Sequence, residues 1–131
     1  MEFHPYQNDS KLLEYCQEAG IQVLQVNMML YNLDPCSSDK QVEGYSPLGK
    51  GLVLQDPIVK EIASSLQVTP AQVLVRWSLQ QGVVTIPKSV KKERVEENWK
   101  VWDFQLSEEQ MKALGGLHRG TRVTWDPDQV P

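Results

Sequence analysis

Five stretches of the chain show the pattern of an amphipathic α-helix, with apolar residues at helical spacing after a residue that can cap the helix. In the clearest one, Asp56 can serve as the N-cap, Pro57 occupies the first turn, and Ile58–Leu66 carries the apolar stripe. A capping-box pair, Ser107 with Gln110, opens the last one. The expected helices cover Lys11–Ala19, which Asp9 or Ser10 can cap, Asp56–Leu66, Thr69–Gln81, Lys91–Trp99, and the stretch from Ser107 to Gly115-Gly116.

Short apolar runs between these helices predict β-strands. Ile21–Leu24 and the β-branched run Val83–Ile86 are the clearest, and Glu2-Phe3-His4 looks like the end of a strand that Pro5 closes. Strands that alternate with helices across short connections are typical of βα units around a parallel sheet. The pattern therefore predicts an α/β domain with two or three such units.

Composition narrows the functional classes. With 131 residues, of which 40% are hydrophobic and 23% charged, the whole chain (residues 1–131) is expected to form one modest core. A formal net charge of −4 gives no overall attraction to nucleic acid or to an anionic membrane. No apolar run approaches the roughly 20 residues of a membrane helix. The first residues lack the features of a signal peptide, so a cytoplasmic location is expected.

The cysteines and histidines do not form a metal-site pattern. Cys16 falls on the apolar side of the first expected helix, where it is interpreted as a small buried hydrophobic residue, and Cys36 lies in an irregular segment. His4 and His118 are far from these cysteines in sequence, so no metal site is predicted.

A first candidate ligand-binding motif is Tyr45-Ser46-Pro47-Leu48-Gly49-Lys50-Gly51. A tyrosine at the end of a strand can offer its flat ring for stacking. The serine and the glycines allow backbone donors to approach a diphosphate. Taken alone, the same residues could form an ordinary turn.

A second candidate motif is Ile86–Asn98, in which a strand end leads into the start of a helix. Lys88 and Arg94 can clamp a monophosphate there, and Ser89 is able to cap the helix. Glu97 and Asn98 follow one turn after Arg94 on the same face, where they could meet the amino edge of adenine. Taken alone, this could be a solvated basic helix start.

The order of the motifs is more specific than any one of them. The segments are Glu2-Phe3-His4-Pro5-Tyr6, Leu13-Glu14-Tyr15-Cys16, Tyr45–Gly51, Thr69–Trp77, Ile86–Asn98, Trp102-Asp103-Phe104, Leu106-Ser107, Gly120-Thr121-Arg122 and Trp125-Asp126-Pro127. In this order they resemble the C-terminal half of the aldo-keto reductases. The resemblance covers nearly the whole chain except Gln25–Gly44.

That family folds as a (β/α)8 TIM barrel and uses NADPH to reduce aldehydes and ketones. The resemblance implies that this chain is the C-terminal part of such a barrel, with about three βα units, a C-terminal helix and a tail. The implied cofactor contacts are Tyr45 on the nicotinamide, Ser46 and Leu48 beside the diphosphate, Lys88, Ser89 and Arg94 on the 2′-phosphate, and Glu97 and Asn98 on the adenine.

The chain departs from the family pattern first in what it lacks. A barrel of this type needs roughly 250 residues. No segment here matches the family's catalytic aspartate, tyrosine, lysine and histidine, and the Asn-Gln pair that usually precedes the Glu-Phe-His-Pro stretch is absent. His4 matches a structural position of the family, so no catalytic residue is assigned.

The second departure is an apparent inserted loop at Gln25–Gly44. Two arrangements remain open. Either Ile21–Leu24 remains the strand and Tyr45 is displaced, or Gln41–Gly44 replaces the end of that strand and the rest loops out.

The functional expectation is therefore part of an NADPH-dependent carbonyl reductase that is inactive by itself, with a small carbonyl substrate only in the intact enzyme. The alternative is non-enzymatic: a truncated isoform that binds NADPH weakly or associates with other barrels. An incomplete parallel sheet leaves unpaired edges, so self-association through these edges is expected.

Overall fold

The computed structural model describes residues 2–19, 22–24, 41–43, 46–83, 85, 87 and 89–124. Two short 3₁₀ turns, η1 (Gly49–Gly51) and η2 (Val53–Gln55), precede the second helix. The α-helices in these residues are α1 (Ser10–Glu18), α2 (Pro57–Leu66), α3 (Pro70–Gln80), α4 (Lys92–Trp99) and α5 (Glu108–Gly115). Every bound lies within one residue of the bound expected from the sequence.

All of the described helices except α4 begin where a side chain satisfies one of the first free backbone N–H groups. Asp9 Oδ1 accepts a hydrogen bond from the backbone N–H of Leu12 at 3.0 Å, so Asp9 caps α1. Asp56 Oδ1 accepts from the N–H of Ile58 at 2.9 Å and caps α2. Complete capping boxes open α3 and α5: Thr69 with Gln72, and Ser107 with Gln110.

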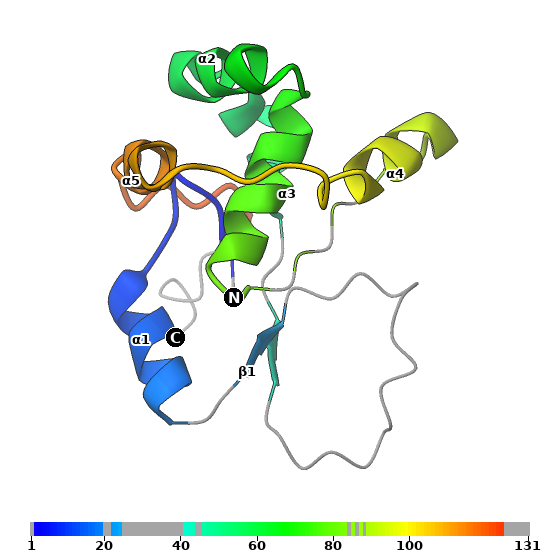
Figure 1. Cartoon of the computed structure of the whole chain (residues 1–131). Coiled ribbons are helices and arrows are strands. Elements are labelled where there is room, and N and C mark those ends of the chain that lie inside the picture. The colour runs from blue at the N-terminus through cyan, green and yellow to red at the C-terminus, as the bar shows by residue number, and fades with distance from the viewer. Residues whose placement is uncertain are drawn as a thin grey trace.

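The third helix is the centre of the core. In Figure 1, α3 runs through the middle of the helical part, with α4 to one side of it and α2 near its N-terminal end. All seven residues from 72 to 78 are buried, and the ring of Trp77 stacks on Phe3 with centroids 5.1 Å apart. The remaining core residues are Tyr6, Leu13, Cys16, Val53, Val59, Ile62, Ala63, Val73, Leu74, Val83, Leu106 and Leu114.

The N-terminal segment forms a tight turn. His4 and Gln7 exchange backbone hydrogen bonds of 3.1 and 2.8 Å across Pro5-Tyr6. The segment Glu2–His4 was expected to form the end of a strand. In the structure, Glu2 and His4 form isolated β-bridges, and the segment is not part of a β-strand. The carbonyl oxygen of Tyr6 also accepts from the N–H groups of Arg119 and Thr121, so this turn holds the start of the C-terminal tail.

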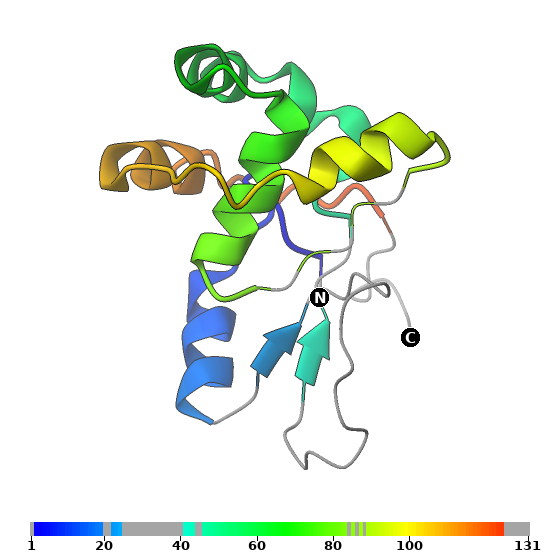
Figure 2. The ribbon, with the colours of Figure 1, turned by 45° about the vertical axis from the view of Figure 1, so that its right-hand side comes forward.

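The segment interpreted as an inserted loop contains a strand. Strands β1 (Gln22–Leu24) and β2 (Gln41–Glu43) are parallel neighbours, with Gln22 opposite Gln41 and Leu24 opposite Glu43. The predicted strand is present, and Gln41–Glu43 forms a second strand beside it and does not replace its end; whether Tyr45 is displaced stays a prediction, because Tyr45 lies outside the described residues. Figure 2 shows the two strands side by side, next to α1 and below the other helices. Residues 25–40 and 44 lie outside the described residues.

The expected strand Val83–Ile86 is tested only in part. Val83 and Thr85 are buried, while Val84 and Ile86 lie outside the described residues. Cys16 is buried, as predicted.

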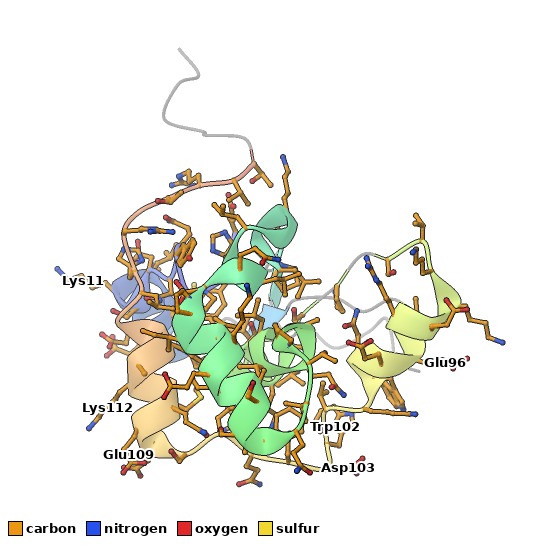
Figure 3. The ribbon with its side chains drawn as sticks, turned by 90° about the horizontal axis from the view of Figure 1, so that it is seen from above. Lys11, Glu96, Trp102, Asp103, Glu109 and Lys112 are labelled. Carbon is orange, nitrogen blue, oxygen red and sulfur yellow. The ribbon has the colours of Figure 1, made fainter. Side chains whose placement is uncertain are left out.

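Charged side chains lie on the outer faces of α1, α4 and α5. In Figure 3, Lys11 projects from α1, Glu109 and Lys112 from α5, and Glu96 from α4 on the opposite side. No helix in the described part of the chain is long and apolar enough to cross a membrane.

Candidate functional site

A cleft of about 400 Å³ lies where α2, the start of α3 and α4 come together. One wall comes from the loop after β2 and from η2, and the second comes from the start of α3. The third comes from α4 and from Ser89, which precedes that helix. The lining residues are Leu48, Leu54, Gln55, Lys60, Thr69, Pro70, Ala71, Ser89, Arg94, Glu97 and Asn98.

The cleft brings together residues from both motifs that the sequence singled out. Leu48 comes from the first motif, and Ser89, Arg94, Glu97 and Asn98 come from the second. These segments lie about 40 residues apart in sequence, yet they line one cleft together with the start of α3, and α3 contacts α4.

Of the predicted residues that the structure describes, Ser46 is not among the residues that line the cleft. Ser46 is described and half-buried, at the start of the loop that leads to Leu48. Tyr45 and Lys88 lie outside the described residues, so their predicted contacts with a cofactor stay predictions.

The loop of the first motif is held in a tight backbone conformation. Ser46 and Gly49 both have positive φ, at 58° and 53°. The N–H of Gly49 donates to the carbonyl oxygen of Ser46 at 2.9 Å. A non-glycine residue with positive φ is uncommon and is typical of turns and ligand-binding loops.

Gly49 has a steric reason to be glycine. A Cβ atom at this position would lie 2.4 Å from Cγ2 of Val53, which is fully buried. The loop therefore packs closely onto η2, and this contact fixes the position of Leu48 at the edge of the cleft.

The start of α4 differs from the sequence expectation in one respect. Ser89 was expected to be able to cap this helix, but the N-cap is Lys91, which makes no side-chain cap hydrogen bond. The hydroxyl oxygen of Ser89 instead accepts from the N–H of Lys91 at 3.2 Å and forms a local turn before the helix. Because Lys91 precedes the helix in an extended conformation, Ser89 lies in the cleft wall and not at the helix end.

Positive charge enters the cleft from two sides. Arg94 comes from α4 and is exposed to solvent, and Lys60 comes from α2, where its Nζ donates to Gln55 Oε1 at 2.8 Å. Guanidinium and ammonium groups that share a cleft with a serine hydroxyl suit a phosphate-bearing ligand. The donor set of the cleft is thus compatible with a nucleotide.

The deeper part of α4 provides polar recognition groups. Asn98 is buried, and its side chain can donate and accept hydrogen bonds. The Glu97 carboxylate accepts a hydrogen bond from the Thr69 hydroxyl at 2.5 Å. This arrangement places an amide and an oriented carboxylate beside Arg94, which can read a heterocyclic base and its phosphate together.

The sequence analysis did not identify Lys60 or Thr69 as site residues, nor the lining residues Leu54, Gln55, Pro70 and Ala71. Thr69 was interpreted as the start of an expected helix and as part of the segment Thr69–Trp77 that resembles the family, not as a site residue. The signal that could have pointed to it is that helix N-termini attract anions, but nothing in the local sequence indicates that α3 begins opposite α4.

His4 lies in the core, away from the cleft. It is fully buried, and its Nε2 lies 3.0 Å from Oε1 of Glu2. Burial lowers the pKa of His4, with the neighbouring Glu2 opposing the shift. The structural role expected for His4 stays a prediction. Among the described residues, no three side chains of His, Cys, Asp and Glu gather to hold a metal ion.

Comparison with known proteins places these observations in a family. The model of the aldo/keto reductase family matches residues 1–119. The chain is 37% identical over 128 residues to the uncharacterized oxidoreductase YtbE of Bacillus subtilis, covering 98% of this chain and 39% of that protein. It is also 37% identical over 130 residues to the glyoxal reductase of Bacillus subtilis, covering 99% of this chain and 40% of that protein.

Solved structures show the same relationship in three dimensions. A point mutant of Gox0644 in complex with NADPH matches with a TM-score of 0.79 and 32% identity, over 100% of this chain and 42% of that one. A putative 2,5-diketo-D-gluconic acid reductase B matches with a TM-score of 0.78 and 28% identity, over 99% of this chain and 40% of that one.

The chain thus spans about 40% of the length of the relatives it matches, and its fold is the corresponding part of their TIM barrel. With the match over residues 1–119, this shows that the chain belongs to the aldo/keto reductase family.

Proposed function

We propose that the cleft binds the adenosine 2′-phosphate end of NADPH, and that the chain contributes this part of the cofactor site to a reductase that converts carbonyls to alcohols. The observation that carries the proposal is the meeting of Leu48, Ser89, Arg94, Glu97 and Asn98 in one cleft. A similar solved structure of the family is a complex with NADPH.

Different residues are expected to contact different parts of NADPH. Arg94 and Ser89, together with Lys88, hold the 2′-phosphate by charge-assisted hydrogen bonds. Glu97 and Asn98 meet the adenine from the inner face of α4. The diphosphate and nicotinamide extend along the other motif, where Ser46 and Leu48 flank the diphosphate and Tyr45 stacks on the nicotinamide.

When bound, the cofactor supplies a hydride to the carbonyl carbon. The chain's own part in this chemistry is to hold and orient the cofactor. Since no segment of the 131 residues matches the family's catalytic set, we expect the chain by itself to consume no NADPH when it is mixed with an aromatic aldehyde. Steady NADPH oxidation by the pure chain would contradict this part of the proposal.

Cofactor titration tests the binding proposal directly. The purified chain is titrated with NADPH and with NADH by calorimetry, and NADPH is expected to bind more tightly because only NADPH carries the 2′-phosphate. Arg94→Ala should weaken NADPH binding and leave NADH binding nearly unchanged.

Lys92→Ala is the matched control for this titration. Lys92 is a cation of the same helix that does not line the cleft, and its Nζ lies 3.7 Å from Oε1 of Glu96 on the exposed surface. Its replacement should leave the preference for NADPH intact. Equal effects of the two substitutions would mean that general charge, and not the cleft, attracts the nucleotide.

A further inference from the structure

The hydroxyl group of Thr69 connects two helices at the cleft. Its oxygen accepts from the N–H of Gln72 at 3.3 Å, which closes the cap of α3. Its hydrogen is donated to Oε1 of Glu97 on α4 at 2.5 Å. A hydroxyl has one hydrogen to give, so in this arrangement it is committed to the carboxylate.

The side chain of Gln72 reinforces the same connection. Its Oε1 accepts from the backbone N–H of Thr69 at 2.9 Å. Its Nε2 donates to the carbonyl oxygens of Glu97 at 3.2 Å and of Lys100 at 2.8 Å. Glu97 is therefore held to the first turn of α3 through both its backbone and its carboxylate.

Thr69 and Glu97 both line the cleft, and an isolated glutamate side chain would sample several rotamers there. We propose that Thr69 is a positioning residue for base recognition: by holding Oε1 of Glu97, it presents Oε2 to an amino group on the bound nucleotide base. This inference rests on the proposed function, because it concerns how the same cleft recognises its ligand.

The chemistry of the base makes the proposal testable. An ionised carboxylate can only accept hydrogen bonds. Adenine offers it an exocyclic amino group, whereas hypoxanthine carries a carbonyl oxygen at the same position, which repels the carboxylate. A fixed Glu97 should therefore discriminate between the two bases, and an unrestrained one should discriminate poorly.

The experiment compares the affinity of the 131-residue chain for NADPH with its affinity for the hypoxanthine analogue of NADPH. The unmodified chain should bind NADPH roughly tenfold more tightly, which is the size expected for one hydrogen bond to a charged group. Thr69→Ser keeps the hydroxyl and should keep this ratio. Thr69→Val removes the hydroxyl and should bring the ratio close to one.

Two further variants separate positioning from helix capping. Thr69→Asp keeps an acceptor for the Gln72 N–H but has no hydrogen to donate, so it should also lose the discrimination even if the valine variant does not fold. Ser107→Ala removes the equivalent capping-box hydroxyl from α5, away from the cleft, and should leave the ratio unchanged.

The outcomes distinguish this inference from the proposed function. If the unmodified chain binds neither nucleotide, both fail. If it binds both nucleotides equally, or if Thr69→Val and Thr69→Asp retain the ratio, then Thr69 does not position Glu97, and the cofactor cleft itself remains supported.

Discussion

The Thr124 hydroxyl donates a hydrogen bond of 2.6 Å to Oε2 of Glu2, 122 residues earlier in the chain. The other carboxylate oxygen of Glu2 accepts from the backbone N–H of Val123 at 2.8 Å and lies 3.0 Å from Nε2 of His4. Glu2 is buried, so one carboxylate fastens the C-terminal tail to the core.

Removal of the Thr124 hydroxyl should loosen this tail. Thr124→Val takes away a hydrogen bond to a charged acceptor, for which we expect a loss of about 1.5–3 kcal/mol in the free energy of unfolding. Trypsin should then cleave faster after Arg122, as judged by the mass of the released peptide. Thr121→Val is the control, because Thr121 bonds to Tyr6 through its backbone N–H, which the substitution keeps. Equal cleavage of both variants would contradict the role of Glu2.

The Glu2–His4 pair should make the protein sensitive to acid. Burial alone would raise the pKa of Glu2, but the hydrogen bonds from Thr124, Val123 and His4 outweigh it and hold that pKa below its ordinary value. Burial lowers the pKa of His4. In both cases the unfolded chain takes up protons more readily than the folded chain as the pH falls, so acidification favours unfolding.

The expected pH range follows from the ordinary values. The free energy of unfolding should be highest above about pH 6.5, fall as unfolded His4 becomes protonated, and fall further below about pH 4.3 as unfolded Glu2 does. Denaturant unfolding at several pH values measures this. His4→Gln should flatten the limb that starts near pH 6.5, and an unchanged slope there would show that His4 is not its cause.

The loop beside the cleft should not tolerate a side chain at Gly49. Gly49→Ala places a methyl group against buried Val53, in addition to the strain of positive φ. Gly51→Ala shares the positive φ but meets no atom within 4 Å. We expect Gly49→Ala to lower the unfolding free energy by about 1–3 kcal/mol more than Gly51→Ala does. Equal losses in urea unfolding would mean that φ alone constrains this loop.

Gln80 should stabilise the segment between α4 and α5. Its Oε1 accepts from the N–H of Leu106 at 2.7 Å, and its Nε2 donates to the carbonyl oxygen of the same residue at 3.1 Å. Gln80→Met keeps the helix propensity but leaves the N–H and the carbonyl oxygen of Leu106 without the Gln80 side chain. We expect the free energy of unfolding, measured by thermal unfolding, to fall by about 1–3 kcal/mol. Gln80→Glu keeps the acceptor for the N–H and should lose less; a larger loss would indicate that the donor matters more.

Local chemistry explains why the helices could be predicted. Asp56, Thr69 and Ser107 each bond to a backbone N–H two or three residues ahead, so the signal and the structure lie within one turn. The apolar stripe of α2 is likewise periodic along the sequence itself. The pairing of β2 with β1 was missed because strand pairing depends on partners outside the segment.

The candidate site could likewise be predicted only in part. The order of the two ligand motifs and the family to which they belong could be predicted, because that information is carried by the identity and spacing of residues along the chain. That Lys60 and Thr69 share a cleft with Arg94, and that Thr69 holds Glu97, became visible only in the folded chain. These contacts arise from the packing of α2, α3 and α4, and the distance between helices is not encoded by the periodicity of any one of them.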